Sequence, residues 1–253
     1  GLAALRAVVE RHVVYFDRHN LPDLGPFMRF ELPTIGRIYD ASGSPLIELA
    51  REYREVVRYE DIPPIVRDAI LAAEDKRFFS HNGIDYLSVP RVFGKVRGGM
   101  LAGRLVRGSA LFPQGGSTIT QQLVRGTFLR GVTEQENSYE LRPIGVGARV
   151  LSSIMGARSV NMLSRKREEM RLSLWLEHEM RNRFGSKRRA KEELLARYAS
   201  LVYMGHGQYG FARAADYYFG RRLTTFTADD ADKAALLAGI AKSPRAYAPS
   251  ARD

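Results

Sequence analysis

The sequence predicts a mainly α-helical protein with one small β-hairpin near its N-terminal end. Apolar residues recur at helical spacing in segments such as 2–18, 164–177 and 191–204. Alternation typical of strands is convincing only in residues 35–49, where two runs flank a Ser-Gly turn. A length of 253 residues with 45% hydrophobic content suffices for one large domain or two lobes with a sizeable core.

Helix boundaries follow from residues that start or stop helices. Pro63 and Pro64 open a helix that ends near Glu74, because proline is tolerated where the first N–H groups have no partner. Ser117 is the expected N-cap of a helix over 117–125. The remaining expected elements are a short strand at 56–59, a helix at 86–96, a glycine turn at 205–210, and a last helix from Thr227 to Pro244.

Other segments show weaker periodicity of apolar residues or a biased composition. Residues 20–33 are irregular and contain prolines, and residues 133–161 show little periodicity, as in an insertion. Residues 181–190 are strongly basic, which fits a solvated loop or helix end. Residues 101–112 mix glycine, arginine and apolar residues, which fits either an ordinary surface loop or a lip that touches lipid headgroups.

The composition points to an anionic partner. Lysine and arginine number 39 against 28 acids, so the formal charge is 39 − 28 = +11. Such a charge favours nucleic acid, a phosphate-bearing substrate or a membrane surface. The absence of cysteine excludes disulfides and thiolate zinc sites. No apolar run approaches the roughly 18 residues of a transmembrane helix, and the chain starts at Gly1, so we expect any membrane anchor outside this chain.

The end of the helix that Pro64 opens is the first candidate site. Glu74 and Asp75 lie where the helix dipole places partial negative charge, which disfavours an ionised carboxylate and tends to raise its pKa. A carboxylate in that position is a candidate general base. The alternative is that both acids only pair with Lys76 and Arg77.

A second candidate lies where glycines precede a helix. Gly115 and Gly116 come directly before the expected N-cap, and N–H groups at a helix start can hold an anion. The helix then presents a polar face at positions i, i+3, i+4 and i+7, formed by Thr118, Gln121, Gln122 and Arg125. The alternative is a solvated surface with a good cap.

A third candidate is the charged start of the helix over 164–177. Arg165 and Lys166 lie four and three positions before Glu169, so all three can meet on one face. One interpretation is surface ion pairing, which contributes only a few tenths of a kcal/mol per pair. The other is a carboxylate held by two cations beside a bound phosphate.

Together these residues resemble the signatures of the peptidoglycan glycosyltransferases, the glycosyltransferase domain of class A penicillin-binding proteins and monofunctional transglycosylases. The first signature is matched by Glu74, Asp75, Phe78, His81, Gly83 and Asp85. Residues 115–123 match the second, Arg165, Lys166 and Glu169 the third, and residues 203–220 the fourth. Leu237, Ala238, Gly239, Pro244, Tyr247 and Pro249 match the fifth. The resemblance covers residues 34–249, so we expect a glycosyltransferase domain over 34–253 after an N-terminal helix and linker over 1–33.

The chain departs from the family pattern in several places. The fourth signature usually has glutamate and asparagine where this chain has Ala196 and Ser200, which puts supporting hydrogen bonds of that helix in question. After the second signature, Arg125 keeps the family's cation, but Gly126 replaces an asparagine. The gap between the second and third signatures is long, and residues 178–190 look expanded, as in a divergent branch.

The resemblance implies a lysozyme-like, two-lobed helical fold whose smaller lobe dips into the membrane. It also implies transfer of a glycan chain from undecaprenyl pyrophosphate onto the 4-hydroxyl of lipid II, at the outer face of the bacterial cell membrane. Carried over, Glu74 is the general base, and Arg125, Arg165, Lys166 and Lys242 neutralise the leaving pyrophosphate. Glu169 orients those cations or holds a divalent metal, Mg²⁺ or Mn²⁺. The other implied substrate contacts are Asp75, Phe78, His81, Ser117, Thr118, Gln121 and Gln122.

Other functions remain open from the sequence. A glycan-cleaving lytic transglycosylase or lysozyme shares a helical cleft centred on a glutamate, but cleavage has no pyrophosphate for the cations near Glu169 to neutralise. A catalytically impaired membrane scaffold would fit the departures at Ala196 and Ser200. Nucleic-acid binding is suggested only by charge, and no binding motif accompanies it, so we expect no nucleic-acid partner. A fused transpeptidase domain and other cell wall synthesis proteins are expected partners.

Overall fold

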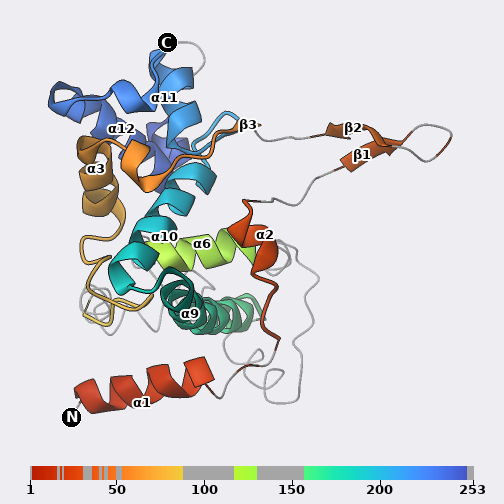
Figure 1. The fold of residues 1–253 in the computed structure, drawn as a ribbon, viewed down its shortest axis with the longest axis vertical. Helices are drawn as coiled ribbons and strands as arrows, with labels where there is room; N and C mark the ends of the chain where they lie inside the picture. Colours follow the sequence, from red (N-terminus) through yellow and green to blue (C-terminus); the bar gives the residue numbers. More distant parts are fainter. Residues whose placement is uncertain are drawn as a thin grey trace. The chain divides into compact units, whose positions relative to one another are not determined.

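The computed structural model of the chain describes residues 2–15, 18, 20–30, 36–39, 42, 45–49, 53–87, 117–129 and 157–249. These residues are mainly helical, which confirms the predicted class (Figure 1). The chain divides into two compact units. Unit 1 contains residues 1–21 and 77–187, and unit 2 contains residues 22–76 and 188–253.

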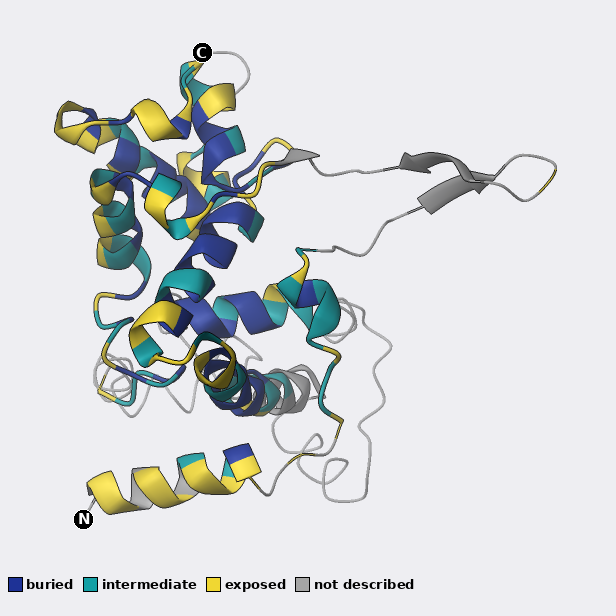
Figure 2. Ribbon diagram, in the orientation of Figure 1, coloured by how far each residue is buried: buried dark blue, intermediate teal, exposed yellow. Residues whose placement is uncertain are grey.

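Unit 1 is organised around the long helix α9, Ala157–Phe184, which contacts α1, Leu2–Tyr15, and α6, Ile119–Thr127. Val14, Ile84 and Leu174 form a small buried cluster at the α1 side. Most of the described side chains of α1 are exposed (Figure 2). Helix α9 begins seven residues before the expected start at 164, so the aperiodic appearance of 157–161 was misleading. Helix α1 ends before the expected residue 18.

Unit 2 contains α2, Gly25–Met28, α3, Pro64–Glu74, and α10, Lys187–Leu201. It also contains α11, Phe211–Phe219, α12, Ala231–Lys242, and α13, Pro244–Tyr247. Helix α12 contacts α3, α11 and α13. In α10, every residue from Leu194 to Ser200 is buried. The predicted boundaries hold at Pro64, which opens α3, and at Lys242, which ends α12. Thr227 instead caps a short 3-10 turn, Ala228–Asp230, so α12 begins only at Ala231.

Short strands complete unit 2. Strand β1, Gly36–Tyr39, pairs antiparallel with β2, Pro45–Leu49, in the range where the sequence predicts a hairpin. Strand β3, Tyr53–Arg54, pairs in parallel with β4, Gln208–Tyr209. The short strand expected at 56–59 is wrong in position. A 3-10 turn, Tyr59–Asp61, occupies the end of that range instead.

Ser200, where the family usually has asparagine, makes two hydrogen bonds in unit 2. Its hydroxyl donates to the Ala196 carbonyl at 2.8 Å and accepts from the Val57 backbone N–H at 3.0 Å. Ser200 therefore ties α10 to the chain that follows β3. Gly210 lies against the same residue, since a Cβ there would be 2.6 Å from the Ser200 carbonyl oxygen, and its φ of +82° also favours glycine.

Arg197 fixes α2 to the same helix. Its guanidinium lies over the ring of Phe30, 4.5 Å from the centroid, and over the ring of Phe27 at 5.3 Å. It also donates to the Met28 carbonyl at 3.2 Å. A buried arginine with these contacts holds residues 25–30 on α10.

Three expectations lie outside the described residues. They are the basic lip at 101–112, most of the helix at 86–96, and the insertion before residue 157. None of the helices in the described part of the chain is long and apolar enough to cross a membrane.

Candidate active site

The first group of candidate residues lies at the end of helix α3 in unit 2. Glu74 is the last residue of α3 and is partly buried, with its Oε1 atom shielded from solvent. Asp75 is the C-cap, and its N–H donates to the Leu71 carbonyl at 3.0 Å. Asp75 is also 6% exposed. The two neighbouring acids thus differ, because Asp75 closes the helix while Glu74 extends from its last turn.

Lys242 lies at the same helix end. It is the last residue of α12, and its Nζ donates to the Ala73 carbonyl of α3 at 2.8 Å. The ammonium group therefore sits where α3 carries partial negative charge, which is a favourable position for a cation. Unit 2 thus brings together Glu74 and Lys242.

The turn after α3 belongs to unit 1. Phe78 is fully buried, and its ring contacts the rings of Phe79 and His81. His81 is also buried, and its Nδ1 accepts from the Gly83 N–H at 3.1 Å, so the ring proton is on Nε2. Both residues therefore make protein contacts that shape the turn.

Arg77 and Asp85 close this turn with a forked ion pair. The arginine Nε lies 3.1 Å and an Nη 2.6 Å from the two carboxylate oxygens. The sequence indicates Arg77 only as a partner of the acids before it, because an eight-residue separation gives no helical signal for its pair with Asp85.

The start of α6 differs by one residue from the expectation. Thr118, not Ser117, is the N-cap. The Thr118 hydroxyl accepts from the Gln121 N–H at 3.2 Å, and the Gln121 side chain returns a bond to the Thr118 N–H at 3.3 Å. This capping box leaves the Ser117 hydroxyl for a different contact, with Lys166.

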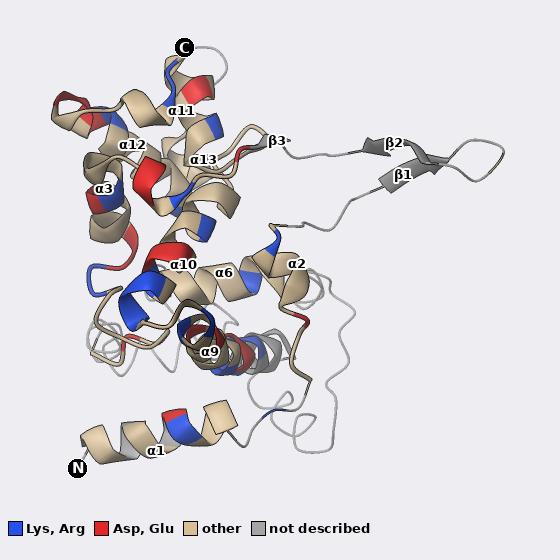
Figure 3. Cartoon of the chain, in the orientation of Figure 1, with Lys and Arg blue, Asp and Glu red and all other residues tan. Residues whose placement is uncertain are grey.

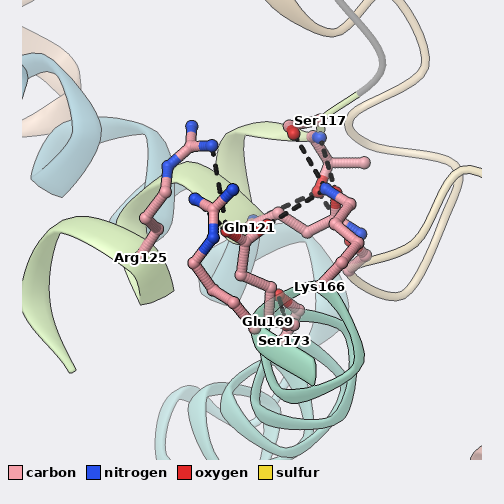
Figure 4. A network of polar contacts seen from close by, with 9 residues as sticks. Ser117, Gln121, Arg125, Lys166, Glu169 and Ser173 are labelled. Carbon is pink, nitrogen blue, oxygen red and sulfur yellow. Dashed lines mark hydrogen bonds and ion pairs between the residues drawn. The ribbon is translucent and has the colours of Figure 1, made fainter. Parts of the chain in front are cut away.

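The second group of candidates surrounds Glu169 of α9 (Figure 4). The Glu169 side chain is fully buried, and its Oε2 lies 3.0 Å from Lys166 Nζ. Its Oε1 lies 3.3 Å from a guanidinium nitrogen of Arg165 and 3.8 Å from one of Arg125. Lys166 also donates to Ser117 Oγ at 2.9 Å and to Gln121 Oε1 at 3.1 Å. We call Arg125, Arg165, Lys166 and Glu169 the cation cluster.

Charge in the cation cluster is unbalanced. One carboxylate faces three cations, so the described group carries an excess of positive charge. Burial lowers the pKa of Lys166, while Glu169 opposes that shift and the two arginines add to it. An anion bound here would compensate the excess charge, and the arginines could hold phosphate oxygens in bidentate fashion.

Glu169 is not suited to hold a divalent metal by itself. Mg²⁺ and Mn²⁺ need several oxygen ligands, and the Glu169 oxygens already face three cations. Within the described residues, no group of three or more histidine or acidic side chains could hold a metal ion. The donor set therefore does not fit a metal held by these side chains alone.

The predicted polar face of α6 is only partly one surface. Gln121 turns into the capping box and the Lys166 contact, whereas Arg125 reaches Glu169 and Gln122 is partly buried. Basic residues, drawn blue in Figure 3, lie at the end of α9 and the start of α10, and most of them are exposed. Ordinary helical spacing thus brought Arg165, Lys166 and Glu169 together correctly, but it did not predict the contribution of α6.

Sequence reasoning missed several residues behind the cation cluster. Ser173 and Glu177 follow Glu169 at four and eight positions on α9, and both are buried. Their spacing from Glu169 was a signal that they share its face. Thr120 is also buried, and it donates to Glu177 at 2.6 Å.

A helical protein with a carboxylate held among cations beside a capped helix start fits the class of enzymes that act on phosphate-bearing substrates. The family model described as Transglycosylase matches residues 42–253, and the chain belongs to this family. The match confirms the resemblance predicted from the ordered signatures.

The relatives that this chain resembles are larger proteins. Penicillin-binding protein 1F of Bacillus subtilis (strain 168) is 33% identical over 213 residues, covering 84% of this chain and 23% of that protein. Penicillin-binding protein 1A of Neisseria flavescens is 30% identical over 229 residues, covering 90% and 22%. Penicillin-binding protein 1A/1B of B. subtilis is 30% identical over 221 residues, covering 87% and 19%. The chain thus spans 19% to 23% of the length of these relatives.

Proposed function

We propose that this chain polymerises lipid II into glycan strands of peptidoglycan and releases undecaprenyl pyrophosphate. The observation that carries the proposal is the cation cluster, in which Arg125, Arg165 and Lys166 surround one buried carboxylate. A departing pyrophosphate develops negative charge, and preorganised cations lower the barrier by stabilising that charge. A reaction that only cleaves glycans has no such leaving group.

In the proposed reaction, Glu74 accepts the proton of the 4-hydroxyl of the acceptor lipid II. The oxygen forms a bond to the anomeric carbon of the donor glycan, and the bond from that carbon to the pyrophosphate oxygen breaks. The leaving group departs as lipid pyrophosphate, and its charge is compensated by the cation cluster. Glu169 keeps the cations oriented, while Lys242 supplies a further positive charge at the end of α3.

The cellular setting is part of the proposal. A lysozyme-like, two-lobed domain over residues 34–253, preceded by an N-terminal helix and linker over 1–33, would work at the outer face of the cell membrane. The relatives are penicillin-binding proteins, which supports a fused transpeptidase domain and cell wall synthesis partners in the full protein. A divalent cation, Mg²⁺ or Mn²⁺, would bind together with pyrophosphate oxygens, since Glu169 alone does not fit a metal.

The proposal is tested by incubating the protein with purified lipid II and, separately, with finished peptidoglycan. We expect polymer from lipid II and no cleavage of peptidoglycan, with and without added Mg²⁺ compared in parallel. Lys166→Ala and Arg125→Ala should weaken donor use strongly, whereas Arg183→Ala, an exposed residue of the same helix α9, should not. Peptidoglycan cleavage without polymer formation would overturn the proposal in favour of a lytic enzyme. Absence of both reactions would favour a scaffold.

A further inference from the structure

A second buried carboxylate lies on the same face of α9 as Glu169, and the proposed reaction gives it no role. Glu177 is 3% exposed and follows Glu169 by eight positions, about two helical turns. Its Oε1 accepts a hydrogen bond of 2.6 Å from the Thr120 hydroxyl. Thr120 is itself fully buried, in the first turn of α6.

Thr120 stands next to the residue that α6 contributes to the cation cluster. Gln121 closes the capping box with Thr118 and accepts from Lys166 Nζ with the same oxygen, Oε1. The position of that oxygen therefore depends on how the first turn of α6 is held. The Thr120–Glu177 bond holds that turn on α9 at a point separate from the Lys166 contacts.

The turn at Gly83 is held on the same face of α9. The Thr118 hydroxyl donates to the Gly83 carbonyl at 2.6 Å. A Cβ at Gly83 would be 2.7 Å from the Ser173 carbonyl oxygen and 3.2 Å from Glu177 Cγ. The Ser173 hydroxyl in turn donates to the Glu169 carbonyl at 2.5 Å. Glu169, Ser173 and Glu177 thus form one strip of α9 against which the α6 start and the Gly83 turn are packed.

A buried carboxylate at this position does not by itself stabilise the fold more than an apolar side chain would. Removing such a charge from water costs more than burying an apolar side chain of similar size. The charge does, however, make the hydrogen bond from Thr120 stronger and more directional than a neutral acceptor would. These properties suit a residue that fixes geometry.

We infer that Glu177 is a positioning residue, which holds the first turn of α6 through Thr120 so that Gln121 and Ser117 keep Lys166 directed at an anionic leaving group. This inference rests on the proposed function, because it needs the cation cluster to bind pyrophosphate. Glu177 does not itself contact substrate. Its effect reaches Lys166 through Thr120 and the first turn of α6.

The test measures binding of inorganic pyrophosphate to the purified chain by calorimetry, which requires no polymerisation. Thr120→Val keeps the side-chain shape and removes the donor, so we expect affinity about threefold to tenfold weaker, the range of one hydrogen bond. Thr120→Ser restores the hydroxyl and should recover most of the affinity. The matched control is Thr127→Val, at the other end of α6, which should bind as wild type.

Polymerisation assays give a second readout. Thr120→Val should raise KM for the lipid-linked donor and lower kcat together, while circular dichroism and melting show a folded protein. If Thr120→Val does not fold, Glu177→Gln decides, since the neutral amide is a weaker acceptor and should reduce pyrophosphate affinity about twofold to fivefold. Unchanged affinity in that variant would overturn the inference.

Lys166→Ala distinguishes a failure of the positioning role of Glu177 from a failure of the proposed phosphate site. If Lys166→Ala loses pyrophosphate binding while Thr120→Val binds normally, the positioning role is wrong and the proposed function stands. If Lys166→Ala binds pyrophosphate as well as wild type, the phosphate site itself is wrong. Equal weakening in Thr120→Val and Thr127→Val would mean general loosening of α6 and would also reject the inference.

Discussion

Glu169 in unit 1 and Glu74 in unit 2 are set in different ways. Glu169 is fully buried among three cations and shares the oxygen-rich neighbourhood of Ser117 and Gln121. Glu74 is only partly buried, at the last turn of α3, where Lys242 binds the preceding carbonyl. The first arrangement holds a carboxylate in one orientation through three cationic neighbours, which suits the proposed orienting role. The second leaves a carboxylate at a helix end, which suits the general base that we propose.

The sharpest test of this difference is Glu74→Gln. The amide has nearly the same shape but cannot accept a proton, so kcat for lipid II polymerisation should fall by about 10²–10⁴-fold. The melting temperature should stay close to that of wild type, because Glu74 is not part of the cation cluster. Turnover near the wild-type rate, measured with pure lipid II, would remove Glu74 from its proposed role.

Glu169→Gln should instead damage the fold of unit 1. Removing one partner of a buried ion pair leaves uncompensated charge and typically costs about 3–5 kcal/mol. Denaturant unfolding should therefore show a large loss for this variant, together with loss of activity. If Glu169→Gln were as stable as Glu74→Gln, the contrast between the two carboxylates would not hold.

The pH dependence of unit 1 sharpens the comparison further. Burial lowers the Lys166 pKa below its usual 10.5, so folding favours the neutral amine in the window just below pH 10.5. The stability contribution of Lys166 is then complete above pH 10.5 and is lost as pH falls through the lowered pKa. Pyrophosphate affinity should follow the opposite trend and decline as pH rises toward 10.5. Lys166→Arg stays charged and should lose less affinity in calorimetric titrations over that range.

The smallest expected effect is a gain in stability. Gly126 lies inside α6, and a Cβ there would meet nothing within 4 Å. Gly126→Ala should stabilise the protein by up to about 0.5 kcal/mol, since glycine weakens a helix and Gly126 stands in the last turn of α6. Thermal melting would detect the change, and unaltered pyrophosphate binding would show that this helix face is separate from the cation cluster.

Much of the fold could be predicted from local sequence signals. Proline at Pro64 and the stop at Pro244 act within one helical turn, and the structure starts α3 and ends α12 at or next to these residues. Thr227 was less informative, because it caps a 3-10 turn that precedes α12. Helical spacing also predicted the pairing of Glu169 with Arg165 and Lys166. These contacts depend only on residues that are neighbours along one helix.

Contacts between segments far apart in the sequence could not be predicted from local patterns. The Ser200 hydroxyl binds the Val57 N–H across 143 positions, and Thr120 reaches Glu177 across 57. The N-cap was displaced from Ser117 to Thr118 because Lys166, 49 positions away, takes the Ser117 hydroxyl. Local pattern cannot tell which of two adjacent hydroxyls caps a helix when a third segment competes for one of them.

The buried amine of Lys166 has a chemical consequence. A lysine whose pKa is lowered is unprotonated for a larger share of time than surface lysines at the same pH, and the neutral amine is the nucleophilic form. Small aldehydes or acylating reagents that carry a phosphate group should therefore label Lys166 ahead of the exposed lysines. An acylating reagent would form a stable amide at this amine and expel its own leaving group, so it would block the proposed anion site with an inhibitor that dilution cannot remove.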